Sequence, residues 1–193
     1  MENFIEVYED VLSKDSCEEI INWFESNEDL YTNGHILVGY QDSGLENSVV
    51  DKTVKDSTDI NCVFSSEFPP SEIIFPVLAE CLFKYVDKFP FMKGISEFQV
   101  DRTYNIQRYY PNQGFFQEHC ENSCKGDARL AAWSLYLNDV EDGGETLYTM
   151  YDSKVKAKAG RLCIFPAYWT HSHKGITSPT ETKYIATGWF SFT

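Results

Sequence analysis

The sequence predicts a mainly β protein of the α+β class, built as a double-stranded β-helix (jelly roll) with supporting N-terminal helices. Two observations lead to this prediction. From residue 97 onward, short strand-like segments follow one another and are separated by turns containing Gly, Asn and Asp, whereas both helical patterns lie before residue 90. Aromatic residues, at 16% of the chain, recur in short β-type runs rather than in long helical ones.

A chain of 193 residues has the size of one domain. We therefore expect a single domain over residues 1–193, with helical support and a variable loop in 1–97 and the jelly-roll core in 98–193. The net charge of −14 disfavours nucleic acid and anionic membranes as partners. No segment resembles a signal peptide or a membrane span, so the sequence predicts a soluble, cytoplasmic protein with reduced cysteines.

Residues 3–9 alternate apolar and polar side chains and predict a first strand. The next stretch, VLSKDSCEEIINWFESN, predicts a helix that Ser13 or Asp15 can cap. Its core face is marked by an apolar stripe at helical spacing, formed by Cys17, Ile20, Ile21 and Phe24.

Residues 29–70 are polar and weakly patterned, and a loop of this length inside a compact domain is often a lid or a binding segment. Pro69 and Pro70 end this stretch. A second helix is expected from Ser71, with Pro76 tolerated in or near its first turn.

The second half of the chain contains seven strand candidates, at 98–110, 115–121, 129–138, 145–150, 161–166, 168–173 and 183–192. The strongest turn signal is NDVEDGGET, because Gly143 and Gly144 reach positive φ without strain.

His119 and Glu121 lie two residues apart in an expected strand, so their side chains point to the same face and Cys120 points away. One further imidazole, from His171 or His173, would complete a three-ligand metal site with open positions, the arrangement used by non-haem Fe(II) oxygenases. Alternation does not choose between these two histidines, because both fall on one face of an extended segment. An alternative is a zinc site made by His119, Cys120 and Cys124.

Lys183 begins an alternating strand, KYIATGWF, that enters the apolar core. A buried ammonium group needs an anionic partner. A dicarboxylate such as 2-oxoglutarate would provide one if its keto-acid end bound the metal and its far carboxylate met the lysine. A structural ion pair within the protein is the alternative.

Several motifs, in this order and at these spacings, resemble the Fe(II)- and 2-oxoglutarate-dependent oxygenase superfamily, specifically its prolyl 4-hydroxylase-like branch. They are His119-x-Glu121, GGET at 143–146, RLCIFPAYWTHSHKG at 161–175 and KYIATGWF at 183–190. The stretch VLSKDSCEEIINWF also resembles the helix that precedes the core in that branch. Together the resemblance covers roughly residues 5–30 and 98–193.

The resemblance implies that His119, Glu121 and His173 bind iron as the catalytic centre, and that Lys183 pairs with the far carboxylate of 2-oxoglutarate. Further cosubstrate contacts are implied for Tyr109 (or its neighbour Tyr110), Tyr136, Thr146 and Trp189. Most members have Asp where this chain has Glu121, whose extra methylene moves the carboxylate outward.

The implied activity is that of a 2-oxoglutarate-dependent dioxygenase that hydroxylates a prolyl residue in a peptide or protein. Its cofactors would be Fe(II) and 2-oxoglutarate, with dioxygen as cosubstrate and ascorbate as an optional addition. The same residues also allow a small-molecule hydroxylase of this superfamily or a non-catalytic jelly-roll binding module. Residues 31–70 and 122–127 are expected to form a mobile cover over the site.

Overall fold

The computed structural model describes residues 2–40, 46–122 and 127–193, with the backbone alone for 37–40 and 46–47. Its centre is a seven-stranded antiparallel sheet in the order β1-β12-β9-β14-β7-β6-β2. These strands are β1 (Glu6–Tyr8), β2 (Thr32–Asn33), β6 (Thr58–Val63), β7 (Phe98–Tyr109), β9 (Arg129–Tyr136), β12 (Arg161–Pro166) and β14 (Lys183–Phe192).

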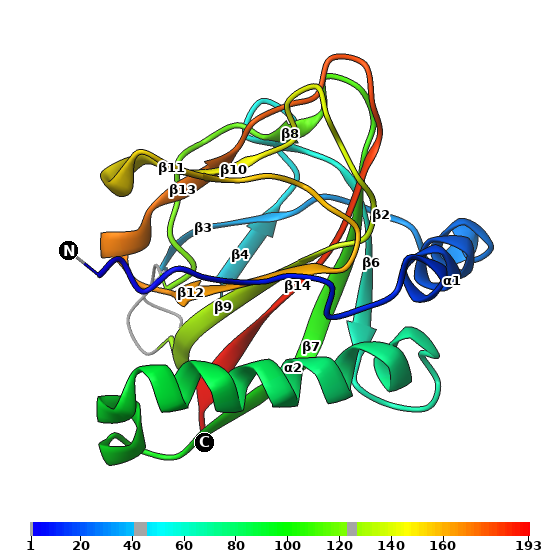
Figure 1. Cartoon of the computed structure of the whole chain (residues 1–193). Coiled ribbons are helices and arrows are strands. Elements are labelled where there is room, and N and C mark those ends of the chain that lie inside the picture. The colour runs from blue at the N-terminus through cyan, green and yellow to red at the C-terminus, as the bar shows by residue number, and fades with distance from the viewer. Residues whose placement is uncertain (1, 41–45, 123–126) are drawn as a thin grey trace.

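Short strands form three smaller antiparallel sheets, β11-β10-β13, β5-β8 and β3-β4. Their bounds are β3 (Ile36–Tyr40), β4 (Glu46–Val49), β5 (Lys55–Asp56), β8 (Gly114–Phe115), β10 (Thr146–Tyr148), β11 (Ser153–Val155) and β13 (His173–Gly175). Figure 1 shows β8, β10, β11 and β13 on one side of the large sheet and helix α2 lying across the other. The predicted mainly β fold of the jelly-roll type is confirmed.

Two α-helices cover the outer face of the large sheet, α1 (Lys14–Glu25) and α2 (Pro70–Lys88). Ser13 caps α1, because its side-chain oxygen accepts a hydrogen bond from the Ser16 amide. Four 3-10 helices complete the chain, at Glu28–Leu30 (η1), Pro90–Gly94 (η2), Thr149–Tyr151 (η3) and Trp169–His171 (η4). Neither α1 nor α2 combines the length and hydropathy needed to cross a bilayer, and no other helix in the described ranges does so.

The large sheet is buried on both faces and separates two apolar clusters. On β9, Trp133 and Leu135 face the helices, where they pack with the buried side chains of α1 and α2. Ala132 and Tyr136 alternate with them and face the small sheets. This alternation places every second residue of the central strands on the inner side, where the cavity described below lies.

The structure differs from the sequence prediction in the loop of residues 29–70. That segment contributes β2 and β6 to the large sheet and also forms β3, β4 and β5. β6 was missed because only six residues carry its pattern, with buried Asp59 interrupting the apolar positions. The predicted strand at 168–173 is wrong in its first part, since Trp169–His171 form η4 and only His173 enters a strand.

Two smaller corrections concern the predicted strand at 115–121 and the second helix. Of the predicted strand 115–121, only Phe115 belongs to a strand, and His119 is held by a single isolated bridge. Helix α2 begins at Pro70, and Pro76 lies inside it rather than in its first turn. The apolar face of α2 is buried against the sheet, which compensates for the hydrogen bond that a mid-helix proline removes.

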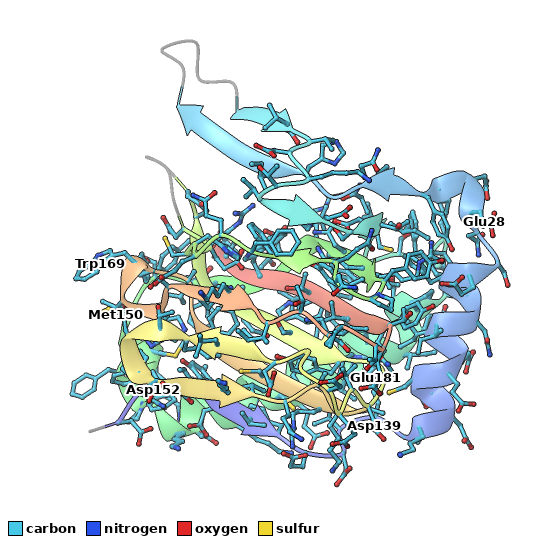
Figure 2. All side chains as sticks on the ribbon, turned by 90° about the horizontal axis from the view of Figure 1, so that it is seen from above. Glu28, Asp139, Met150, Asp152, Trp169 and Glu181 are labelled. Carbon is cyan, nitrogen blue, oxygen red and sulfur yellow. The ribbon has the colours of Figure 1, made fainter. Side chains whose placement is uncertain are left out.

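Figure 2 shows the side chains of the molecule seen from above. The exposed side chains of Trp169 and Met150 project at the end opposite to Glu28. Trp169 is 73% exposed.

Candidate metal centre

Three side chains that the sequence singled out meet at one point. His119, Glu121 and His173 each offer a ligand atom, and these atoms all lie within 4.8 Å of one another. Glu121 Oε1 lies 3.3 Å from His173 Nε2 and 3.7 Å from His119 Nε2. The geometric condition for a shared metal ion is therefore met.

Backbone pairing brings the two histidines together across the chain. The His119 amide donates to the His173 carbonyl at 3.0 Å, and the His173 amide donates to the His119 carbonyl at 2.8 Å. The ring of Phe115 stacks on His119 with centroids 3.7 Å apart, which restricts the rotation of that imidazole. His173 also begins β13, which pairs with β10 and so fixes it to the small sheet.

Hydrogen bonds orient both imidazoles toward the shared point. His119 Nδ1 lies 3.0 Å from the Gln117 carbonyl oxygen, and His173 Nδ1 lies 3.0 Å from the His171 carbonyl oxygen. A carbonyl oxygen only accepts, so each Nδ1 carries the proton and donates it. Each Nε2 then keeps a lone pair for a metal ion. Two such nitrogens and one carboxylate oxygen suit Fe(II) with open positions.

The two oxygens of Glu121 have different partners. Oε1 faces the histidines, whereas Oε2 accepts a hydrogen bond of 2.7 Å from the indole N–H of Trp189. Burial is the strongest influence on this carboxyl group and acts to raise its pKa. The combined effect of His119 and His173 outweighs burial and holds the pKa of Glu121 well below its usual range. The carboxylate is therefore ionised and available as a ligand.

The three convergent side chains line a cavity of about 630 Å³ between the large sheet and the small ones. Its floor comes from side chains that alternate along β7 and β14. These are Asn105, Gln107 and Tyr109 on β7 and Lys183, Ile185, Thr187 and Trp189 on β14. Antiparallel pairing of the two strands places Lys183 directly opposite Tyr109.

Lys183 is a buried cation in the wall of this cavity, with 7% of its surface exposed. Burial lowers the pKa of its ammonium group to about 8. Its Nζ donates to the Gly144 carbonyl at 3.2 Å and lies 5.1 Å from the centre of the Tyr109 ring. Among the described residues it has no ion-pair partner, so the alternative of a structural ion pair finds no support.

The GGET turn supplies that carbonyl. Gly143 and Gly144 have φ values of 81° and 77°, and a Cβ on Gly143 would meet the Thr177 carbonyl oxygen at 2.3 Å. Glycine is therefore required for the chain to pass Thr177 and present the Gly144 carbonyl to Lys183. Thr146, the last residue of the motif, lines the cavity.

The other predicted cosubstrate residues differ in whether they line the cavity. Tyr109 lines the cavity, whereas Tyr110 is exposed and its ring lies against the Arg108 guanidinium. Tyr136 is fully buried behind the cavity wall, and its hydroxyl pairs with that of Thr146 at 2.7 Å. Tyr136 therefore lies behind Thr146 instead of lining the cavity.

Tyr109 ends a chain of buried polar contacts that the sequence analysis missed. Its hydroxyl donates to Gln107 Oε1 at 2.8 Å, and Gln107 Nε2 donates to Asp59 Oδ2 at 3.3 Å. The same Asp59 oxygen pairs with Lys55 Nζ at 2.7 Å, and Ser57 donates to the other oxygen. Gln107 could have been found by alternation from Tyr109. Lys55 and Asp59 gave no signal, because they lie in the segment expected to be a loop.

Among the described residues, the alternative ligands His171 and Cys120 do not join the three convergent ligand atoms. His171 Nε2 lies 2.8 Å from the Asn3 carbonyl oxygen, and its Nδ1 lies 2.9 Å from the Thr170 hydroxyl, so both ring nitrogens are engaged. Cys120 Sγ is directed to the Asn122 carbonyl, as expected for a residue that points away from His119. Cys124 lies outside the described residues, as does most of the expected cover at 122–127. From the segment 31–70, His35, Ile36, Val54 and Lys55 line the cavity.

Comparison with known proteins bears on this centre. Residues 104–191, which contain all three ligand residues and Lys183, match the family model of the 2OG-Fe(II) oxygenase superfamily. The resemblance predicted from the sequence is thereby confirmed. A search among curated proteins finds none that matches this chain.

Solved structures of prolyl hydroxylases share the fold. A collagen prolyl hydroxylase of Paramecium Bursaria Chlorella virus-1, solved with 2-oxoglutarate, is 19% identical with a TM-score of 0.65 over 98% of this chain and 96% of its own. A prolyl-4-hydroxylase of Pseudomonas putida is 14% identical with a TM-score of 0.71 over 99% and 94%. A prolyl hydroxylase of Trichoplax adhaerens, in complex with a hypoxia inducible factor peptide, is 16% identical with a TM-score of 0.73 over 98% and 84%. These neighbours show the fold, and the family match supports a 2-oxoglutarate-dependent dioxygenase.

Proposed function

We propose that this protein is an Fe(II)- and 2-oxoglutarate-dependent dioxygenase that hydroxylates a prolyl residue in a peptide or protein. One observation carries the proposal: the three convergent ligand atoms share a cavity with a buried lysine that has no ion-pair partner among the described residues. A jelly-roll module that only binds a partner needs neither feature.

His119 Nε2, His173 Nε2 and Glu121 Oε1 would hold the metal ion. When bound, Fe(II) supplies the redox chemistry that couples decarboxylation of 2-oxoglutarate to hydroxylation of a substrate C–H bond. Lys183 would bind the far carboxylate of the cosubstrate, because an ammonium group with only a carbonyl partner gains most from an added anion. Tyr109 and Thr146, which line the same end of the cavity, would contact the cosubstrate beside it.

The prolyl substrate is the finer part of the proposal. It is supported by the prolyl hydroxylase neighbours, one of which is solved with a peptide fragment. The cavity wall beyond Lys183 also presents amide and hydroxyl groups suited to hydrogen bonds with a peptide backbone, from Asn105, Gln117, Ser134 and Thr187. We further propose one domain over 1–193, since the large sheet pairs strands from both ends of the chain.

The test measures succinate released from 2-oxoglutarate in the presence of Fe(II), with and without ascorbate and with a set of proline-containing peptides. Mass spectrometry of the peptides detects the addition of one oxygen atom and locates it. His119→Ala should lose all turnover, because two ligands do not hold Fe(II) in a defined geometry. Lys183→Ala should lose 2-oxoglutarate affinity while still binding metal.

Lys93→Ala is the matched control for Lys183, since Lys93 pairs with Asp87 at the surface. No succinate from the wild-type protein, together with no protection of it by 2-oxoglutarate against unfolding, would reject the enzyme in favour of the binding module. Succinate formation with every peptide unmodified would retain the dioxygenase and reject the prolyl substrate in favour of a small molecule.

A further inference from the structure

The outer oxygen of Glu121 is held by a tryptophan at the far end of the cavity from Lys183. Trp189 Nε1 donates to Glu121 Oε2 at 2.7 Å, while Oε1 faces the two imidazoles. The carboxylate thus has one oxygen engaged by the protein and one directed to the metal position. An indole N–H only donates, so the contact requires Oε2 to remain an acceptor.

Arg129 fixes the indole of Trp189 by lying over its ring. The Arg129 guanidinium lies 4.0 Å from the centre of the Trp189 ring, and Arg129 Nη1 donates to the Glu121 carbonyl oxygen at 2.9 Å. Arg129 thus contacts both the tryptophan and the backbone of the ligand residue. The arginine also lies 3.7 Å from an oxygen of Asp127.

A register shift in β14 gives Trp189 the freedom to reach the ligand. The pairing of β14 with β7 is interrupted between Gly188 and Phe190, so Trp189 has no partner on β7 and keeps only Ala132 on β9. Such irregularities re-aim a side chain next to a site. Gly188 is needed there, because a Cβ would lie 2.7 Å from the Trp133 ring.

We propose that Trp189 is a positioning residue, which holds one oxygen of Glu121 so that the carboxylate binds the metal ion through the other oxygen alone. This chain has glutamate at the position because its side chain is long enough to contact the metal ion and the indole at the same time. This inference rests on the proposed function. Two imidazoles and one carboxylate oxygen would hold the metal ion and leave its remaining positions open for a chelating cosubstrate and dioxygen. A glutamate free to rotate could bind through both oxygens and would remove one of those positions.

The experiment uses the full chain and Mn²⁺ or Co²⁺ as the probe, with binding followed by calorimetry in the absence of 2-oxoglutarate. Trp189→Phe removes the N–H donor and keeps a ring for Arg129 to contact. We expect its metal affinity to fall by about 10-fold or more, the usual effect of losing a hydrogen bond to a ligand. Trp169→Phe, on the exposed tryptophan, is the matched control and should bind as the wild type does.

A second readout reports the coordination itself. The visible spectrum of the Co²⁺-loaded protein should change between wild type and Trp189→Phe, because the number of carboxylate oxygens on the metal changes. In a Glu121→Asp background the shorter side chain does not reach both partners, so Trp189→Phe should then have an effect several-fold smaller than in the wild type.

The outcomes separate the two proposals. If the wild-type protein binds Mn²⁺ and Co²⁺ but Trp189→Phe matches Trp169→Phe in affinity and spectrum, the positioning role is wrong and the metal site stands. Equal effects of Trp189→Phe in the wild-type and Glu121→Asp backgrounds would also overturn it. If the wild-type protein binds neither ion, the proposed function itself fails.

Discussion

Replacing Lys183 by methionine should stabilise the protein in the absence of cosubstrate. The lysine is 7% exposed, and burial lowers the pKa of its ammonium group from an ordinary value of 10.5 to about 8. Each tenfold change in proton affinity corresponds to about 1.4 kcal/mol, so keeping the group charged in the folded state costs about 3 kcal/mol. Methionine has a similar length and no charge. It also loses the hydrogen bond to Gly144, worth roughly 1 kcal/mol, so the net gain should be about 2 kcal/mol.

The pH dependence identifies the cause of this gain. The folded pKa lies below that of the unfolded chain, so the unfolded state binds more protons between about pH 8 and 10.5. The penalty in the wild type is therefore complete below pH 8 and fades as the pH rises toward 10.5. Urea unfolding of metal-free protein across this range should show the advantage of Lys183→Met shrinking as the pH rises.

The same substitution should remove the response to cosubstrate. With metal present, 2-oxoglutarate at 100 times its dissociation constant should stabilise the wild type by about 2.7 kcal/mol, and it should not stabilise Lys183→Met. Lys93→Met, at an exposed ion pair, is the control and should show neither effect. A Lys183→Met protein that is less stable than the wild type at pH 7, or an advantage that does not depend on pH, would refute the reasoning.

Three other predictions test further parts of the structure. Lys55→Met should destabilise the fold by about 3–5 kcal/mol in urea unfolding, because it leaves the Asp59 carboxylate buried without its cation. The double variant Lys55→Met/Asp59→Asn should recover part of this loss. A double variant whose loss of stability equals the sum of the two single losses would contradict the prediction. His171→Phe should lower the free energy of unfolding by about 1–2 kcal/mol, because the contact with Asn3 is lost, and it should keep metal affinity. His173→Ala should abolish metal binding. The opposite result would exchange the roles of the two histidines. Replacing residues 37–48 by a short Gly-Ser turn should raise the amount of succinate formed per hydroxylated product, because His35 and Ile36, which precede this segment, line the cavity. An unchanged ratio of succinate to hydroxylated product would reject the role of this segment as a cover.

Strand alternation accounts for most of what the sequence could predict about the site. Because β14 is a regular strand over residues 183–187, the alternation expected for KYIATGWF holds there, and Lys183, Ile185 and Thr187 all line the cavity. The same alternation on β7 brings Gln107 beside Tyr109 in the cavity wall, although the sequence prediction named only Tyr109. Alternation could not choose between His171 and His173, since that choice depends on η4. The short helix carries His171 to the Asn3 carbonyl and lets the strand begin at His173.

Contacts that depend on an irregular backbone could not be predicted from the sequence. The expected strand through His119 and Glu121 is a single bridge, held in place by His173 and by the ring of Phe115. The hydrogen bond from Trp189 to Glu121 depends on a register shift between Gly188 and Phe190, and a one-residue irregularity leaves no mark on a hydrophobic pattern.

The buried pair of Lys55 and Asp59 shows why the segment 29–70 could not be assigned from its composition. Polar residues in a weakly patterned stretch predict a surface loop, since a buried charge is costly without a partner. Here the two charges satisfy each other at 2.7 Å, and Ser57 and Gln107 bind the same carboxylate. The segment can therefore pair with β7 through β6. Lys55 lies in the cavity wall, and Asp59 is connected to Tyr109 through Gln107. In this segment a polar pattern thus marks buried residues beside the site, because the charged groups that would normally require solvent pair with one another there.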